Sequence, residues 1–441
     1  MANNVLQAIA DGLKRGGVKD VYNFPGFHSH ELFDLLGGKL TSTNEKIAYE
    51  LAWGSSQAGR PAVVTFKNVG LNDAADPFIN SMLTGIGSGL VVVVFDNIEL
   101  EGSQAILDSR HYFSFYGGLW LEPYDLLSAI VLSEAAIRLS STYNIPVVLR
   151  LTNQALAFTD TSNSSFPSAK QIIQIAERTT KPSQAIVPVV HPAHGNTQRQ
   201  RIQHLQLDLQ AFSDDLHALV NPKDNMISIY SGYSSSEATY HIVSLPVPGI
   251  GTSNVAEIHE IGDDVISASL ASMQYKTPWE SNQIGYNPKN ASRVIVSDRY
   301  RDLFGLLKPH FQYIAGDLGE YTKDTLDTIT HCLCFGSAIS VATGMLEAGS
   351  SALAVIGDAA FYHSGQNVIT EAMQRAPKLK VVLLDNHGSQ GTGGQVIPGV
   401  IPNDIKVLKI DLDTIALSDL HTVLQTFLEC DTPILMHVIH K

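Results

Sequence analysis

Two apolar segments near the C-terminus each end in oxygen-bearing side chains, and this pair most constrains the fold. Val355-Ile356-Gly357-Asp358-Ala359 comes first, and Leu383-Leu384-Asp385-Asn386 follows after a segment, residues 363–376, whose pattern suits a crossover helix. Apolar segments of this kind are typical of buried parallel strands, which present ligands at their carboxyl edge. Asp and Asn oxygens at neighbouring strand ends can hold Mg²⁺ together with a diphosphate. The alternative is an ordinary strand–helix–strand unit with polar turns.

The length of the chain, 441 residues, predicts two or three domains, and a hydrophobic content of 44% is ample for their cores. A net charge of −14 argues against nucleic acid or an anionic membrane as a partner, because either would require a basic surface. The sequence shows no apolar run of about 18 residues and no basic, apolar leader. We therefore expect a cytoplasmic enzyme.

The cysteines exclude several kinds of site. Cys332, Cys334 and Cys430 provide neither a disulfide framework nor the four thiolates of a zinc or iron–sulfur site. Only one residue separates Cys332 from Cys334, which is poor spacing for a redox pair. Two buried thiols are the better interpretation.

Residues 1–160 are predicted to form an α/β domain. Its expected strands are apolar throughout, which indicates a parallel sheet covered on both faces. The strands are placed at Pro61–Phe66, Gly89–Phe95 and Pro146–Leu151, and the helices at Glu45–Gln57, Ala74–Leu83 and Asp125–Tyr143.

Changes in composition divide residues 161–441 into three further segments. Residues 161–205 are rich in Ser, Thr, Pro and His and are predicted to be a linker. Residues 206–308 suggest a small α/β middle domain, with short strands at Met226–Tyr230 and His241–Leu245. Strand–helix alternation returns in residues 309–441, with a strand at Phe311–Ala315, a helix over Cys334–Glu347 and a last strand near Pro433–Ile439. The chain thus begins and ends with α/β domains of similar size.

The Gly-Asp-Ala…Asp-Asn pair resembles the GDG…NN motif of thiamine diphosphate (ThDP) enzymes. This resemblance implies an α/β ThDP-binding fold with two related, doubly wound parallel-sheet domains: a pyrimidine-binding domain (residues 1–160) and a diphosphate-binding domain (residues 309–441). It also implies ThDP and Mg²⁺ as cofactors, with Asp358, Asn386 and a backbone carbonyl of Gly388 as metal ligands. The cofactor-binding residues that it implies are Gly357, Asp358, Ala359, Leu333, Asn386 and Gly388.

The stretch Asn44–Gly54 resembles the helix start at which this family places its catalytic glutamate, and the alignment puts that glutamate at Glu45. A buried carboxyl with a raised pKa, hydrogen-bonded to the pyrimidine ring, drives the cofactor to its reactive tautomer. Glu50, on another face of the same helix, is the alternative candidate. Glu45 would otherwise be a first-turn acid that favours the helix dipole.

Histidines supply further candidates. His28 and His30 lie in a loop after an expected strand, Asp20–Phe24, where ThDP enzymes place a loop over the thiazolium. Imidazoles there can donate protons near neutral pH, or they can be ordinary surface side chains. His363 resembles the family's Phe-His-Ser-Gly position and is expected near the reacting centre.

Three further residues are weaker candidates. His331 is a site candidate without an assigned role. His387 follows the expected metal ligand Asn386, where it would support that ligand and not bind the metal itself. Leu333 falls where the family bends its cofactor, but a core position would suit a leucine equally.

Several segments resemble, more specifically, the alpha subunit of indolepyruvate ferredoxin oxidoreductase. They are Asn44–Glu50, Lys67–Pro77, Gly89–Phe95, Asp108–Tyr112, Gly316–Thr322, Cys332–Ala342 and Gly357–Gly365. That family binds iron–sulfur clusters through cysteine-rich runs after its diphosphate-binding domain, and this sequence contains none. Where the family has a Cys-Pro-Gly-Cys-Pro-His-Arg stretch, the sequence reads Val294–Tyr300.

These departures favour non-oxidative decarboxylation of a 2-oxo acid, with the enamine protonated to an aldehyde or ligated to an acceptor carbonyl. The resemblance itself implies an aryl or bulky apolar pyruvate as the substrate. The first alternative is the catalytic subunit of a 2-oxo acid ferredoxin oxidoreductase that uses separate iron–sulfur subunits. The second, a degenerate non-catalytic partner, is disfavoured because Glu45, Asp358 and Asn386 are all present. The resemblance also implies a homodimer or a dimer of dimers with active sites at the subunit interface.

Overall fold

A computed structural model describes residues 4–96, 109, 112–113, 118–123, 125–157, 166–180, 186–191, 194–220, 243–244 and 300–440. The predicted strand Met226–Tyr230, most of His241–Leu245, and Asp108, Arg110, His111 and residues 294–299 lie outside these ranges. Across the described ranges, no helix combines the length and the apolar character that crossing a bilayer requires.

The N-terminal half is built on a parallel sheet with strand order β1-β2-β3-β5-β4-β6, in which only β6 is antiparallel to its neighbour. The strands are β1 (Asp20–Asn23), β2 (Ala62–Lys67), β3 (Leu90–Asp96), β4 (Leu119–Leu121), β5 (Val147–Thr152) and β6 (Val243–Ser244). Every residue of β3 is buried, as expected for a strand covered on both faces.

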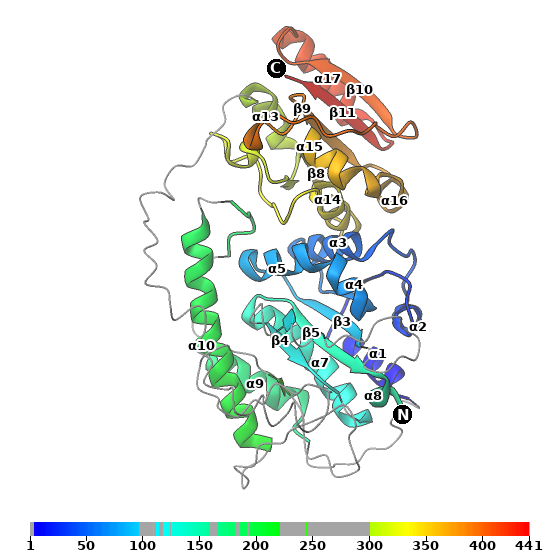
Figure 1. The fold of residues 1–441 in the computed structure, drawn as a ribbon, viewed down its shortest axis with the longest axis vertical. Helices are drawn as coiled ribbons and strands as arrows, with labels where there is room; N and C mark the ends of the chain where they lie inside the picture. Colours follow the sequence, from blue (N-terminus) through cyan, green and yellow to red (C-terminus); the bar gives the residue numbers. More distant parts are fainter. Residues whose placement is uncertain are drawn as a thin grey trace.

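Helices cover both faces of this sheet (Figure 1). They are α1 (Val5–Arg15), α2 (Ser29–Leu35), α3 (Glu45–Gln57), α4 (Asn68–Asp73), α5 (Ala75–Thr84), α7 (Leu126–Tyr143) and α8 (Asn153–Ala157). Local sequence sets where the principal helices start. The side chain of Asn44 accepts a hydrogen bond from the backbone N–H of Ile47 at 2.8 Å, which fixes the first turn of α3. Asp125 and Ser128 form a reciprocal capping box at the start of α7.

The C-terminal sheet is wholly parallel, with strand order β10-β11-β9-β8-β7. Its strands are β7 (Tyr313–Ala315), β8 (Ala352–Gly357), β9 (Lys380–Asp385), β10 (Lys406–Asp411) and β11 (Ile434–Ile439). Its helices are α13 (Arg301–Leu307), α14 (Ala338–Glu347), α15 (Asp358–His363), α16 (Ile369–Arg375) and α17 (Leu417–Glu429), with 3₁₀ turns η2 (Lys308–His310), η3 (Glu320–Lys323), η4 (Gly365–Val368) and η5 (Gln390–Thr392). The predicted α/β class with two doubly wound parallel sheets is confirmed.

Two helix predictions need correction. The crossover expected as one helix over residues 363–376 is α15, η4 and α16 in succession, and α15 already begins at Asp358. The break falls at Ser364 and Gly365, where a Cβ on Gly365 would lie 2.5 Å from the Ile356 side chain. The helix expected from Cys334 begins only at Ala338, because Gly336 holds the preceding turn with a φ of +85°.

Two further helices lie in or begin within the segment predicted as a linker, residues 161–205. They are α9 (Ala169–Thr179) and the long α10 (Gly195–Val220), which lies beside the first sheet (Figure 1). Between them, the backbone N–H of Val190 donates to Cys332 O at 2.9 Å, and that of Cys332 donates to Pro188 O at 2.8 Å. This segment therefore pairs with the C-terminal domain.

The two sheet domains meet through α3 and α14 (Figure 1). A Cβ on Gly54 would lie 2.3 Å from Val341 O, and a Cβ on Gly344 would lie 2.1 Å from Leu51 O. Each helix thus uses one glycine to let the other's backbone approach. One apolar core cluster continues across this contact and includes residues of both domains.

Candidate functional site

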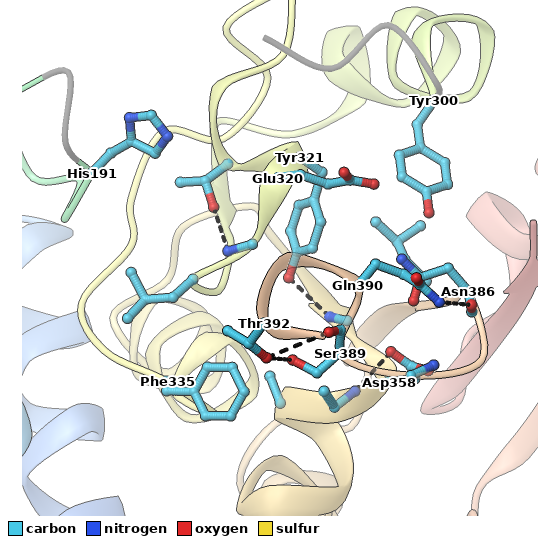
Figure 2. A pocket seen from close by; sticks show the side chains of 18 of the residues that line it. His191, Tyr300, Glu320, Tyr321, Phe335, Asp358, Asn386, Ser389, Gln390 and Thr392 are labelled. Carbon is cyan, nitrogen blue, oxygen red and sulfur yellow. Dashed lines mark hydrogen bonds between the residues drawn. The ribbon is translucent and has the colours of Figure 1, made fainter. Parts of the chain in front are cut away.

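A cavity of about 470 Å³ lies at the carboxyl ends of β8 and β9 (Figure 2). Its size is in the range of small-molecule sites. Five of the predicted cofactor-binding residues meet in its lining: Gly357, Asp358, Ala359, Asn386 and Gly388. The remaining lining residues are Val190, His191, Tyr300, Leu318, Gly319, Glu320, Tyr321, Thr322, Phe335, Ala360, Leu384, Ser389, Gln390 and Thr392.

Asp358 links the turn after β8 to the loop after β9 through hydrogen bonds. Its Oδ1 accepts the backbone N–H of Ala359 at 2.8 Å, and its Oδ2 accepts the backbone N–H of Gly388 at 2.7 Å. Burial raises the pKa of Asp358, these two N–H donors work against that shift, and the nearby Asp385 carboxylate adds to it. A carboxylate has about four lone-pair sites, so two bonds leave it able to coordinate a cation.

The glycine-rich loop after Asn386 is shaped by close backbone contacts. Gly388 has a φ of +140°, and a Cβ there would lie 2.8 Å from Gln395 O. Ser389 Oγ lies 2.6 Å from Thr392 Oγ1, and Gln390 Nε2 donates to Asn386 O at 3.1 Å. The loop therefore presents backbone and hydroxyl groups to the cavity.

This donor set suits Mg²⁺ with a diphosphate. Asp358, Asn386 and the backbone of Gly388 offer oxygen donors of the type that Mg²⁺ prefers, and Mg²⁺ commonly keeps phosphate and water as its other ligands. Within the described ranges, no group of three or more His, Cys, Asp or Glu side chains is arranged to hold a metal by itself. The site thus fits a metal that arrives with a phosphate-bearing cofactor.

Tyr321 is a site residue to which the sequence analysis gave no role. The backbone N–H of Gly357 donates to Tyr321 Oη at 2.8 Å (Figure 2). The ring also occupies the space beside Gly319, where a Cβ would lie 2.6 Å from Tyr321 Cε1. Burial raises the pKa of Tyr321 well above its usual value, so its hydroxyl stays protonated. The only signal in the sequence was its place in the Gly316–Thr322 segment.

The segment around Val190 forms a wall of the cavity that the sequence analysis also missed. Val190 and His191 line the cavity because their segment pairs with Cys332. Among the described residues of the lining, His191 is the one whose side chain can carry a positive charge. No local pattern could have found it, since the pairing joins residues far apart in the chain.

Glu45, the predicted catalytic glutamate, is the first residue of α3 and does not line the cavity. It is half-buried, and its carboxyl lies against Gly70, where a Cβ would meet Glu45 Oε1 at 2.5 Å. Burial raises the pKa of Glu45, its own backbone N–H lowers it, and Asp73 raises it further. A raised pKa allows the Glu45 carboxyl to share a proton with a ligand. The carboxyl does not, however, lie in the cavity of its own chain.

Glu50, the alternative, is occupied elsewhere. Its buried carboxylate accepts from Lys46 Nζ at 2.5 Å and from Cys334 Sγ at 3.3 Å. Burial disfavours the Lys46 ammonium, but Glu50 and Cys334 together outweigh this effect and raise the pKa of Lys46. Burial likewise raises the pKa of the Cys334 thiol. The three side chains form a buried polar group where the domains meet.

The loop histidines also lie outside the cavity lining. His28 has a φ of +63°, precedes α2, and places Nδ1 3.2 Å from Glu31 Oε2. Its ring centroid lies 3.9 Å from that of Phe27. His30 is exposed, with Nδ1 2.9 Å from Gly26 O.

The other candidates lie around the cavity rather than in its lining. His363 is exposed and packs edge-on against Phe335, a lining residue, at a centroid distance of 5.0 Å. Leu333 is fully buried in the core. His331 is buried between Trp53 and Tyr313, and burial lowers its pKa to about 4. His387 is exposed, with Nδ1 3.3 Å from Asp385 Oδ1.

Comparison with known families agrees with this geometry. Residues 317–437 match the model of the thiamine pyrophosphate enzyme C-terminal TPP binding domain, thiamine pyrophosphate being another name for ThDP.

Among curated proteins, the chain is 21% identical to indolepyruvate oxidoreductase subunit IorA of Methanothermobacter thermautotrophicus, over 87% of this chain and 74% of that protein. It is 23% identical to IorA of Archaeoglobus fulgidus, over 89% of this chain and 76% of that protein.

Two solved structures share the fold over nearly their whole length. One, from Mycobacterium smegmatis, is assigned to the thiamin diphosphate-dependent enzymes, with a TM-score of 0.56, 16% identity and complete coverage of both chains. The other is the ThDP-dependent 4-hydroxybenzoylformate decarboxylase of Rhodococcus jostii RHA1, with a TM-score of 0.57, 15% identity and 99% coverage of both chains. The predicted resemblance is confirmed: residues 317–437 match a TPP-binding domain, and the chain has the fold of ThDP-dependent enzymes.

Proposed function

We propose that this ThDP-type chain decarboxylates a 2-oxo acid without oxidising it, and that it releases an aldehyde or transfers the remaining acyl carbon to an acceptor carbonyl. The observation that carries the proposal is the meeting of Asp358, Asn386 and Gly388 in one cavity of a TPP-binding domain. When bound, ThDP supplies the nucleophilic carbon and the electron sink through which a 2-oxo acid loses CO₂.

The cavity residues divide into those that hold the cofactor and those that support them. Asp358, Asn386 and the backbone carbonyl of Gly388 would bind Mg²⁺, and Gly357 and Ala359 would lie along the diphosphate. The Gly357–Tyr321 and Gly388–Asp358 hydrogen bonds hold these turns before any ligand binds. A preformed arrangement of this kind reduces the ordering cost of binding.

Glu45 would hold the proton that the pyrimidine exchanges. Because it does not line the cavity of its own chain, we propose that it acts in the cavity of a second copy, in a homodimer or a dimer of dimers. His28 and His363 are proposed proton donors to the reacting carbon or the substrate carboxylate. His363 is the nearer to the cavity, through Phe335.

The character of the cavity wall supports an aryl or bulky apolar substrate. Val190, Leu318, Phe335 and Leu384 supply apolar surface, and His191 supplies a group that can pair with a carboxylate. The relatives are named for indolepyruvate, and the Rhodococcus structure for 4-hydroxybenzoylformate; both compounds are 2-oxo acids with an aromatic ring.

The alternative function is the catalytic subunit of a 2-oxo acid ferredoxin oxidoreductase with separate iron–sulfur partner subunits. The similarity to IorA over 87% of this chain favours it. In the described part of the chain, Cys332 and Cys334 are buried and Cys334 is hydrogen-bonded to Glu50, so under this alternative the clusters would have to lie on those partner subunits.

The deciding experiment measures CO₂ release by the purified chain with ThDP and Mg²⁺ over a panel of 2-oxo acids, with and without an artificial electron acceptor. We expect release without the acceptor, abolished by Glu45→Gln and by Asp358→Ala. Release that requires the acceptor would establish the oxidoreductase alternative.

Mixing two inactive variants tests the shared site. A chain with Glu45→Gln keeps an intact cavity, and a chain with Asp358→Ala keeps an intact Glu45. If one copy's Glu45 serves another copy's cavity, the mixture regains part of the activity that each variant lacks. A mixture that stays inactive, although mixed dimers form, would contradict the shared site.

A further inference from the structure

A buried carboxylate of the C-terminal domain accepts hydrogen bonds from Thr43, which lies just before Glu45 in the sequence. Glu371, in the first turn of α16, is 6% exposed. Its Oε2 accepts the backbone N–H of Thr43 at 2.8 Å and the hydroxyl of Thr43 at 2.9 Å. These two bonds join residues 328 positions apart, and Thr43 stands two residues before Glu45.

Arg375 completes this contact from the next turn of α16. Its Nε donates to Glu371 Oε1 at 2.7 Å, and its Nη2 donates to Leu40 O at 2.5 Å and to Ser42 Oγ at 3.4 Å. The guanidinium is almost fully buried and lies over the ring of Tyr22, 5.5 Å from its centroid. We call Glu371 and Arg375, with the residues 40–43 that they hold, the α16 clamp.

The α16 clamp holds the residues that directly precede α3. Asn44 follows Thr43 directly and caps the helix through the N–H of Ile47. The first turn of a helix has no preceding turn to hold it, so its geometry depends on such outside bonds. Bonds to a charged acceptor are also stronger than bonds between neutral groups. The direction of the Glu45 carboxyl, in the first position of α3, therefore depends on where Thr43 is held.

We propose that Glu371 is a positioning residue for Glu45: through Thr43 it fixes the first turn of α3 and so the direction in which the Glu45 carboxyl points. This inference rests on the proposed function, which gives Glu45 its proton-holding role. Glu371 does not line the cavity and contacts no group that would react. Its direct bonds to this segment are those to Thr43, and Arg375, which it also binds, holds Leu40 and Ser42 beside it.

The test compares substitutions on both sides of the clamp. Thr43→Val removes the hydroxyl bond and keeps the backbone N–H, whereas Thr43→Ser keeps both bonds. Glu371→Gln preserves the shape of the side chain, but its amide group cannot accept from both Thr43 and Arg375. Glu347→Gln is the matched control, because Glu347 accepts from Arg375 Nη1 at 3.3 Å and has no bond to Thr43.

We expect kcat to fall about 10-fold in Glu371→Gln and Thr43→Val, which corresponds to about 1.4 kcal/mol in activation free energy, with KM changed less than about twofold. Thr43→Ser and the Glu347 control should keep the wild-type kcat. In the chain without cofactor, hydrogen exchange at the amides of Thr43 and Ile47 should speed up in Glu371→Gln and stay slow in Thr43→Ser. This second readout does not depend on turnover.

The outcomes separate the two proposals. A lower melting temperature with unchanged kcat in both Glu371→Gln and Thr43→Val would reduce the clamp to a purely structural contact and overturn the inference. A wild-type chain that releases no CO₂ from any 2-oxo acid would overturn the proposed function itself. An active wild type with an active Glu45→Gln variant would remove the role of Glu45, and the positioning role with it.

Discussion

Tyr321 and Gly357 are joined by a hydrogen bond of 2.8 Å from the Gly357 backbone N–H to the Tyr321 hydroxyl, across 36 residues of sequence. The bond holds the turn that carries Asp358, in the half of the cavity where the diphosphate is proposed to bind.

Tyr321→Phe should lower both stability and cofactor affinity. Leaving the Gly357 N–H without an acceptor costs about 1–3 kcal/mol, and the turn that carries Asp358 loses its support. Denaturant unfolding and ThDP titration measure the two effects. Tyr49→Phe is the control, because it removes a buried hydroxyl, 2.6 Å from Ser81 Oγ, in the other domain. It should match the stability loss and leave ThDP affinity unchanged; equal affinity losses in both variants would contradict the role of Tyr321.

Gly70→Ala should disturb Glu45 with little effect on folding. The added Cβ would lie 2.5 Å from both Glu45 Cγ and Glu45 Oε1, so the half-buried Glu45 side chain would have to rotate away as a whole. We expect kcat to fall several-fold while the unfolding free energy changes by less than about 1 kcal/mol. Gly195→Ala, at a position where nothing lies within 4 Å of the added carbon, provides the comparison. An unchanged kcat in Gly70→Ala would show that the side-chain orientation of Glu45 in this structure is not the one used in catalysis.

Breaking the Lys46–Glu50 pair should be costly for stability. Glu50 is 1% exposed, so Lys46→Met leaves an unpaired buried carboxylate, for which a loss of about 3–5 kcal/mol is typical. Replacing both residues, Lys46→Met with Glu50→Leu, removes the charge and should recover most of that loss. Urea unfolding of the single and double variants measures the difference. A double variant as unstable as the single one would mean that packing, and not charge, dominates at this domain contact.

His331 should make stability fall with acid. Burial lowers its pKa from 6.5 to about 4 in the folded chain, so the unfolded chain binds the proton more readily. The stabilisation from a neutral His331 is complete above pH 6.5, declines as the pH falls, and is gone below about pH 4, a change of about 3 kcal/mol. The unfolding free energy of wild type minus that of His331→Phe, measured from pH 8 to pH 4, isolates this contribution. A difference that does not vary with pH would show that His331 titrates normally.

Local sequence patterns predicted much of the fold because the elements concerned are locally determined. The bounds of α3 were predicted without error, and the side chain of Asn44 caps its first turn. The meeting of Asp358 and Asn386 followed from the rule that parallel strands end at one edge. In α10, however, Leu205, Leu209, Phe212 and Leu216 are buried at helical spacing, whereas the boundary predicted at residue 205 divided this helix between a linker and a middle domain.

Contacts between distant segments account for what the sequence did not reveal. His191 lines the cavity only because its segment pairs with Cys332. The bond from Thr43 to Glu371 joins two unremarkable residues of different domains. The position of Glu45 outside the lining depends on how α3 packs against α14, which no spacing within either helix specifies.

The pairing of Val189 with Cys332 bears on how the chain can be divided. It attaches the N-terminal portion to the second sheet well before the polypeptide re-enters that domain at Tyr300. A cut between Val220 and Tyr300 would therefore leave one fragment with Val190 and His191 and another with Asp358 and Asn386, each supplying part of the same cavity wall. The two fragments would therefore have to associate for this cavity wall to form.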